Sequence, residues 1–174
     1  LEEAVGTEIL GLIGAEFLKR YVVQYDYSNQ KITLFSNASN SYAGDSQGQS
    51  INFEMLGNIP VFEITIANKT LRVGLDSGAE QAMLFLKWEA PLSTYYSFLE
   101  EIELNGADKN SRMTKKVSLN AFEVGTLTYK NQSFLFADMN NSFGSDIDGL
   151  LGYEFLSQYK TTIDYENRKI LISS

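Results

Sequence analysis

Residues 73–79 read VGLDSGA, an apolar run that ends in Asp76, Ser77 and Gly78. Asp, Ser and Gly are common turn residues, so this tripeptide alone indicates only a strand that runs into a turn. An apolar approach is also what a site needs when it keeps a carboxylate away from bulk water. The rest of the chain decides between these two interpretations.

The composition of the 174 residues excludes several classes of function. A net charge of −8 argues against a nucleic-acid partner, because few groups are present to neutralise phosphates. No segment contains the roughly 20 apolar residues that a membrane span needs, so we expect no membrane span. With 44% hydrophobic residues, the chain can build a folded core.

The chain contains no histidine and no cysteine, which limits the chemistry open to it. Serine–histidine catalysis, thiol nucleophiles, and imidazole or thiolate metal sites are therefore excluded within this sequence. Asp146 and Asp148 superficially resemble part of a calcium loop, but the other ligands of that pattern are absent. We expect no metal and no cofactor, and carboxylates are the main candidates for acid–base work.

The chain contains an internal repeat. Residues 9–34 read ILGLIGAEFLKRYVVQYDYSNQKITL, and residues 147–172 read IDGLLGYEFLSQYKTTIDYENRKILI. The two segments align without a gap at an offset of 138 residues, with about half of their positions identical. Each copy predicts an apolar strand, a Gly-x-x-Gly turn, a short helical turn and a β-hairpin. Asp26 and Asp164 recur at the hairpin turns, where a turn role explains them.

Between the copies, the sequence favours short strands. Residues 60–75 predict two strands around an Asn-Lys turn that lead into Asp76, and residues 117–139 predict further strands. Within residues 83–104, the run LSTYYSFLEEIEL has apolar residues at helical spacing and predicts a helix. The chain as a whole is predicted to be mostly β.

Two motifs together point to a known family. VGLDSGA is followed later in the chain by DGLLGYEFL at 148–156 and by a closing hairpin around Asp164. This arrangement resembles the retropepsin-like and pepsin-like aspartic proteases over roughly residues 51–174. The resemblance implies an all-β, closed-barrel lobe with one or two short helices.

The resemblance also implies roles for individual residues. Asp76 is the expected catalytic carboxylate, and it would share a proton with a second aspartate and activate a water. Val73 and Leu75 would form an apolar floor, and Asp148, which lacks an Asp-Ser/Thr-Gly context, would lie beside the catalytic loop. The residues expected to support the site are Ser77, Gly78, Ala79, Gly149 and Leu150.

Other features of the family pattern stay open. Glu80 and Gln81 stand where family members often carry a small polar residue, which leaves the shape of the substrate pocket open. A hairpin over residues 102–119 is a candidate flap, with an exposed polar loop as the alternative.

The repeat suggests how the domains are organised. We interpret residues 1–35 as the end of a preceding lobe, 36–50 as a flexible linker and 51–174 as an aspartic protease lobe. The partner aspartate would come from a missing N-terminal lobe or from a second copy of the chain, so the isolated chain is not expected to hold a complete pair.

Two further functional interpretations remain open beside an endopeptidase acting on peptides or proteins. One is a non-catalytic module that binds peptides, and the other is an all-β adhesion module without a cleft at Asp76. We favour export over a cytosolic location, because two-lobed acid proteases usually work outside the cytosol.

Overall fold

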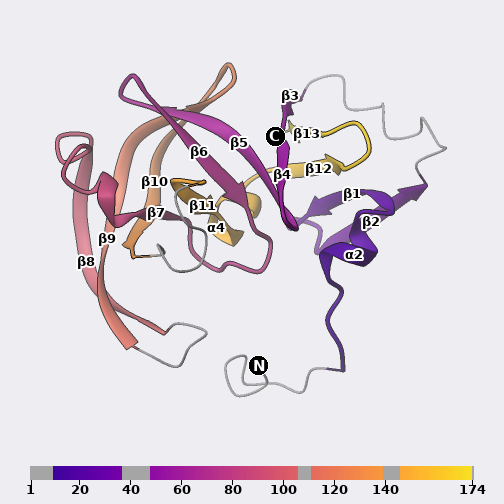
Figure 1. Cartoon of the computed structure of the whole chain (residues 1–174), viewed down its shortest axis with the longest axis horizontal. Helices are drawn as coiled ribbons and strands as arrows, with labels where there is room; N and C mark the ends of the chain where they lie inside the picture. The colour runs from indigo at the N-terminus through magenta and orange to yellow at the C-terminus, as the bar shows by residue number, and fades with distance from the viewer. Residues whose placement is uncertain (1–9, 37–47, 106–110, 139–145, 174) are drawn as a thin grey trace.

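The computed structural model describes residues 10–36, 48–105, 111–138 and 146–173, which form two β-sheets (Figure 1). The larger sheet has eight strands in the order β4-β5-β6-β11-β7-β10-β9-β8. Its strands are β4 (Glu54–Leu56), β5 (Ile59–Ile66), β6 (Lys69–Leu75), β7 (Met83–Phe85), β8 (Tyr96–Asn105), β9 (Ser111–Val124), β10 (Leu127–Ala137) and β11 (Gly149–Leu151). An extra pairing between Thr65 of β5 and Glu123 of β9 closes this sheet into a barrel.

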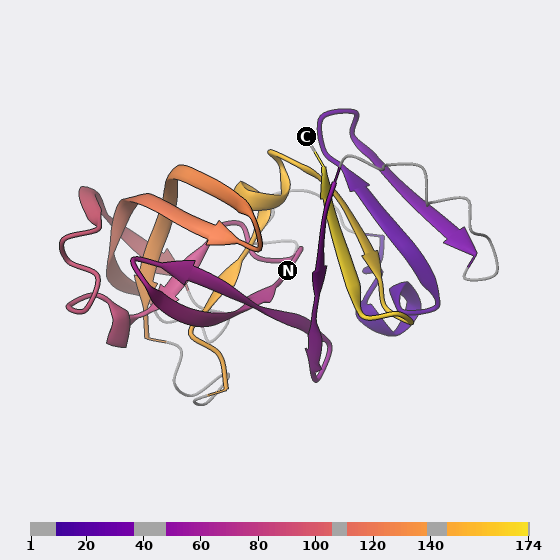
Figure 2. The ribbon, with the colours of Figure 1, turned by 90° about the horizontal axis from the view of Figure 1, so that it is seen from above.

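The smaller sheet has five strands in the order β2-β1-β12-β13-β3. Its members are β1 (Tyr21–Asp26), β2 (Lys31–Ser36), β3 (Gln49–Asn52), β12 (Lys160–Asp164) and β13 (Lys169–Ser173). Figure 2 shows this sheet beside the barrel, with the first and last hairpins of the chain next to each other. The sheet therefore joins the two copies of the sequence repeat.

In the described part of the chain, helical structure is limited to two short α-helices, α2 (Ala15–Leu18) and α4 (Tyr153–Leu156), and one 3-10 turn, η2 (Leu86–Trp88). The predicted all-β fold with one or two short helices is thus confirmed. None of the helices in the described segments is long and apolar enough to cross a membrane.

The turns between paired strands follow from local sequence. Ala67 and Asn68 both adopt positive φ angles, 51° and 68°, in the two-residue turn between β5 and β6. Such a turn matches the twist of a β-hairpin, and asparagine tolerates this backbone conformation well. The hairpin predicted over residues 60–75 is confirmed, but its turn lies at Ala67-Asn68, one residue before the predicted Asn-Lys turn. The hairpin leads the chain to Asp76 directly after β6.

The larger of two clusters of buried apolar side chains joins the barrel to the five-stranded sheet. Its buried members include Val73 and Leu151 from the barrel and Ile163, Ile170 and Val23 from the smaller sheet. Alternate residues of β5 and β6 face this core, as expected for strands with one face against the interior. The barrel and the sheet therefore hold each other in place around the loop that follows β6.

The helix predicted within residues 83–104 is wrong. Residues 96–105 form β8, which pairs with β9, and only residues 86–88 are helical in this region. A β-bulge between Phe98 and Glu100 shifts the register of β8. Because a bulge inserts one residue into the alternating pattern, apolar residues fall at spacings that imitate a helix.

The hairpin expected over residues 102–119 is formed by β8 and β9. Its candidate turns, Asn105-Gly106 and Lys109-Asn110, fall at residues 106–110, outside the described residues except for Asn105. The assignment of this hairpin as a flap stays a prediction. Most of the predicted linker, residues 37–47, likewise lies outside the described part of the chain.

Candidate functional site

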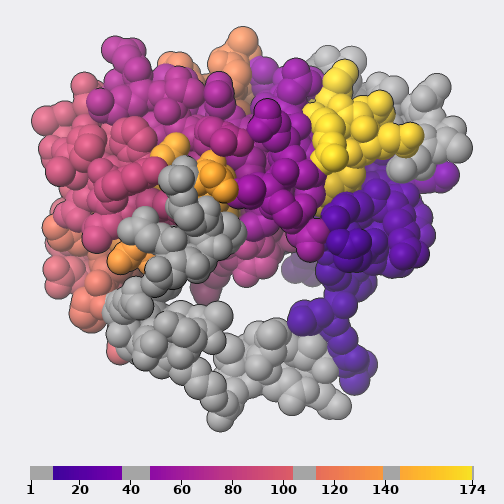
Figure 3. Space-filling view, in the orientation of Figure 1, coloured from indigo at the N-terminus to yellow at the C-terminus, as the bar shows by residue number. Residues whose placement is uncertain are grey.

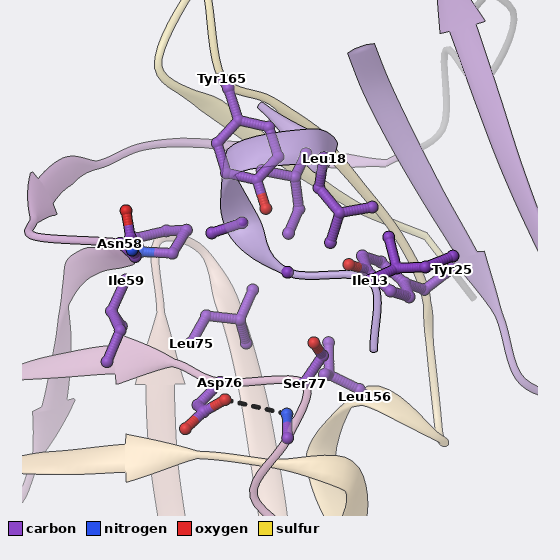
Figure 4. A pocket seen from close by; sticks show the side chains of 15 residues that line it. Ile13, Leu18, Tyr25, Asn58, Ile59, Leu75, Asp76, Ser77, Leu156 and Tyr165 are labelled. Carbon is purple, nitrogen blue, oxygen red and sulfur yellow. Dashed lines mark hydrogen bonds between the residues drawn. The ribbon is translucent and has the colours of Figure 1, made fainter. Parts of the chain in front are cut away.

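The loop that carries Asp76 is fixed by backbone hydrogen bonds on both sides. The Asp76 N–H donates to the carbonyl of Leu151 at 3.0 Å, and the Ala79 N–H donates to the carbonyl of Asp76 at 3.2 Å. The Gly78 N–H donates to Asp76 Oδ1 at 2.9 Å, as the dashed line in Figure 4 shows. One carboxylate oxygen is therefore held by the loop itself, which fixes the direction of the side chain.

Strand β11 supports the Asp76 loop by pairing with β6, the strand that leads into it. β11 runs parallel to β6, with Gly149 opposite Val73 and Leu150 opposite Gly74. A Cβ on Gly149 would overlap the carbonyl oxygen of Met83, so the close approach of β7 requires glycine here. The predicted supporting residues Gly149 and Leu150 thus lie on β11, the strand whose Leu151 carbonyl accepts the Asp76 N–H.

Gly152 contacts the loop more directly than either of these residues, although it is not among the supporting residues predicted from the sequence. A Cβ on Gly152 would overlap the carbonyl oxygen of Ala79. The next residue, Tyr153, donates its N–H to the same carbonyl at 2.7 Å. The sequence does carry a signal for Gly152, because it is the second glycine of the Gly-x-x-Gly turn and that turn occurs in both copies of the repeat.

A cavity of about 320 Å³ lies beside Asp76 (Figure 4). Asp76 is partly exposed and Ser77 and Gly78 are exposed, whereas Leu75 is buried. Leu75 lines the cavity as the expected apolar floor, but Val73 is buried in the core and is not part of the lining. The lining residues are Ile13, Gly14, Ala15, Leu18, Tyr25, Asn58, Ile59, Pro60, Leu75, Asp76, Ser77, Gly78, Leu156, Ile163 and Tyr165.

Asp76 is the one acidic residue among the described residues that line this cavity. The described segments also hold no group of three or more acidic side chains close enough together to bind a metal ion. The chemistry of this cavity therefore centres on one carboxylate.

Tyr25 joins the loop to the first copy of the repeat. Burial raises the pKa of Tyr25, and a hydrogen bond with the Ser77 side chain partly offsets that rise. Burial likewise raises the pKa of Tyr165, which lines the same cavity. Both phenols are therefore neutral near pH 7. The sequence gives no signal for Tyr25, because its counterpart in the second copy of the repeat is Ile163.

Asp148 immediately precedes β11 and acts as a clamp, because it joins the start of β11 to β6 and to η2. Its Oδ2 accepts the Arg72 N–H at 2.9 Å, its Oδ1 accepts Trp88 Nε1 at 2.9 Å, and Lys87 Nζ lies 2.7 Å from Oδ1. Burial acts to raise the pKa of Asp148, but the hydrogen bonds from Lys87, Arg72 and Trp88 outweigh it and lower the pKa below its usual value. Asp148 therefore binds β11 to β6 as a carboxylate.

The remaining carboxylates singled out in the sequence lie away from the cavity lining. Asp26 and Asp164 each accept hydrogen bonds from the asparagine three residues later, Asn29 and Asn167, in the turns of their hairpins. This geometry fits the turn role expected for both. Asp146 is exposed.

Comparisons with known proteins bear on the family of this chain. No curated protein matches the chain. The chain is similar to the crystal structure of a retropepsin-like aspartic protease from Rickettsia conorii, with 15% sequence identity and a TM-score of 0.48, over 72% of this chain and 93% of that chain. The family model described as aspartyl protease matches residues 62–155, which include the Asp76 loop and β11. Because this match covers more than half of the sequence, the chain belongs to the aspartyl protease family.

Proposed function

We propose that this chain supplies one half of the active site of an aspartic endopeptidase, with Asp76 as its catalytic carboxylate. The observation that carries the proposal is the geometry of Asp76. Its carboxylate opens onto a cavity, and its loop is tied on both sides to β11 and α4 through Leu151 and Tyr153. A carboxylate held this firmly can face a reacting water without reorganising.

The chemistry needs a second carboxylate. Two carboxylates a few ångströms apart cannot both ionise readily, so they share a proton. The ionised member accepts a proton from a water, which attacks the carbonyl carbon of the peptide. The protonated member donates to the carbonyl oxygen. The carboxyl that took the proton of the water then passes it to the peptide nitrogen, the C–N bond breaks, and the amine leaves.

In this proposal Asp76 supplies one of the two carboxylates. Since no other acidic residue lines the cavity in the described part of the chain, the second carboxylate comes from another lobe or from a second subunit. Ser77 positions the loop through Tyr25 and does not act as a nucleophile, because this sequence has no histidine to activate it.

The test is hydrolysis of an unfolded protein substrate at acidic pH by the natural polypeptide that contains these 174 residues. We expect pepstatin-sensitive cleavage that Asp76→Asn abolishes. Asp146→Asn is the matched control, because Asp146 is exposed and outside the cavity lining. The control variant should cleave at the wild-type rate.

Two outcomes would count against the proposal. Cleavage that persists in Asp76→Asn would remove this residue from the mechanism. Peptide binding with no cleavage by the wild-type protein would instead favour a non-catalytic module that binds peptides.

A further inference from the structure

The hairpin of β1 and β2 lies against the second copy of the repeat. Figure 3 shows the first copy, in indigo, directly beside the C-terminal hairpin, in yellow, and β1 pairs with β12 along this boundary. Tyr27, just after β1, is half-buried and packs against the larger cluster of buried apolar side chains. The mechanism proposed above gives this tyrosine no role.

The ring of Tyr27 contacts two other tyrosine rings. It meets the Tyr153 ring edge-on, with 5.2 Å between the ring centroids and an interplanar angle of 76°, a favourable arrangement for two aromatic rings. It also stacks with the Tyr25 ring, at 6.3 Å and 12°. Burial raises the pKa of Tyr27, and the nearby Tyr153 phenol adds to this rise. Tyr27 is therefore neutral near pH 7, and its contact with Tyr153 is one of packing.

Tyr153 connects this contact to the Asp76 loop. Its N–H donates to the Ala79 carbonyl at 2.7 Å, and the Ala79 N–H donates to the Asp76 carbonyl at 3.2 Å. A displacement of Tyr153 would therefore reach, through one residue of the loop, the carboxylate that is proposed to act on the peptide.

The end of α4 that carries Tyr153 is less buried than its other end. Phe155 and Leu156 are buried, whereas Tyr153 is 47% exposed. A helix of four residues has little stability by itself, and Gly152 just before it restricts the backbone little. The ring of Tyr27 therefore supplies packing at the end of α4 that holds the loop.

The repeat brings the same two positions to one place a second time. Tyr165 is the counterpart of Tyr27, and Ala15 is the counterpart of Tyr153. Tyr165 and Ala15 both line the cavity beside Asp76, where Figure 4 shows the Tyr165 ring. Each hairpin tyrosine therefore lies towards the helical turn of the other copy. Ala15 also shows that such a turn forms without an aromatic ring at its first residue.

We propose that Tyr27 is a positioning residue for the Asp76 loop. Its ring holds Tyr153 in place, and the Tyr153 N–H in turn holds the Ala79 carbonyl. The first copy of the repeat thereby helps to set the direction of the Asp76 carboxylate, although it lies far from Asp76 in the sequence. The expected effect on catalysis rests on the function proposed above, whereas the effect on the loop does not.

Hydrogen exchange of the 174-residue chain tests the effect on the loop. Tyr27→Ala should speed exchange at the Ala79 and Tyr153 amides at least about fivefold relative to the amides of β10, which report global unfolding. The control is Tyr21→Ala, because Tyr21 lies on β1 and its ring packs on Phe17, with 5.3 Å between the centroids. The control should leave this ratio unchanged. Equal ratios in Tyr27→Ala and wild type would overturn the proposal.

Tyr153→Ala tests the same contact from its other side, and it keeps the test decisive if Tyr27→Ala does not fold. We expect Tyr153→Ala to fold, because α2 forms with Ala15 at the counterpart position. It should speed exchange at Ala79 as Tyr27→Ala does, and the double variant should exchange no faster than either single variant. An unchanged ratio in Tyr153→Ala would overturn the proposal. So would effects that multiply in the double variant, because the two rings would then act independently.

Peptide hydrolysis by the natural polypeptide tests the consequence for catalysis. Tyr27→Ala should lower kcat at least about fivefold and change KM less than about twofold, because a displaced carboxylate affects the reaction more than the binding of substrate. Tyr27→Phe keeps the ring and should have the wild-type kcat, and Tyr21→Ala should also leave kcat unchanged. A wild-type kcat in Tyr27→Ala would overturn the positioning role.

The positioning role and the proposed function can fail separately. If the wild type cleaves no peptide but Tyr27→Ala still speeds exchange in the Asp76 loop, the contact supports the loop and only the proposed function is overturned. If Asp76→Asn abolishes cleavage while Tyr27→Ala changes neither exchange nor kcat, the proposed function stands and the role of Tyr27 is overturned.

Discussion

Gln24 Nε2 donates a hydrogen bond to Thr162 Oγ1 at 3.1 Å, and these two residues are counterparts in the repeat. They also lie opposite each other in the pairing of β1 with β12. Because each residue pairs with its own counterpart at this point, a local two-fold axis passes between them. The duplication in the sequence is therefore a local symmetry of four strands of this sheet, β2-β1-β12-β13, and β3 extends the sheet beyond it.

A double-mutant cycle tests this contact across the axis. Gln24→Ala and Thr162→Val should each destabilise the chain, and their coupling energy should be about 0.5–1.5 kcal/mol, as expected for a neutral hydrogen bond. The measurement is urea unfolding of the wild type, both single variants and the double variant. Fully additive effects would show that this hydrogen bond does not stabilise the sheet.

Gly149 and Gly11 are counterparts with opposite surroundings, which gives a second test. A Cβ on Gly149 would overlap the Met83 carbonyl, whereas one on Gly11 would meet nothing within 4 Å. Gly149→Ala should cost about 1–3 kcal/mol of unfolding free energy, because β7 and β11 must separate. In the 174-residue chain, Gly11→Ala should change the stability by less than about 0.5 kcal/mol. Equal effects of the two variants would contradict the close packing under the Asp76 loop.

Ile170→Ala and Ile32→Ala extend the comparison to an apolar pair of counterparts. Removing the fully buried Ile170 side chain should cost about 2–5 kcal/mol, through lost burial and a new cavity. Ile32→Ala should cost far less in the 174-residue chain, because that side chain is largely exposed there. Thermal unfolding of the two variants measures the difference, and a large loss from Ile32→Ala would show that this side chain is already covered.

Asp148→Asn should weaken the clamp between β11 and β6 in a pH-dependent way. The folded chain lowers the pKa of Asp148 below its usual value of 3.8, so the carboxylate stabilises the fold above about pH 4. That contribution is lost as the pH falls through the lowered pKa.

The measurement is urea unfolding of wild type and Asp148→Asn at pH 7, 5 and 3. The variant should be less stable by about 1–3 kcal/mol at pH 7 and at pH 5, and the difference should shrink towards pH 3. The exposed Asp146→Asn is the control and should show little difference throughout. A constant difference at all three values would mean that the charge of Asp148 is not what stabilises the clamp.

The sequence was sufficient to predict the all-β fold, the two repeat hairpins and the strand that ends at Asp76, because turn residues and alternation encode these locally. It failed at β8, where the bulge between Phe98 and Glu100 gives a strand the apolar spacing of a helix. It also missed Tyr25 and Gly152, whose contacts with the loop depend on how distant segments pack. The roles of Lys87 and Trp88 at Asp148 were hidden for the same reason.

The most direct test of the central claim compares kcat for peptide hydrolysis by Asp76→Asn and Ser77→Ala in the natural polypeptide. We predict that Asp76→Asn lowers kcat by at least about 10²-fold, as expected when an acid–base group is removed. Ser77→Ala should retain most of the wild-type kcat, because this sequence has no histidine to activate a serine hydroxyl. A kcat that survives Asp76→Asn and is abolished by Ser77→Ala would contradict the account.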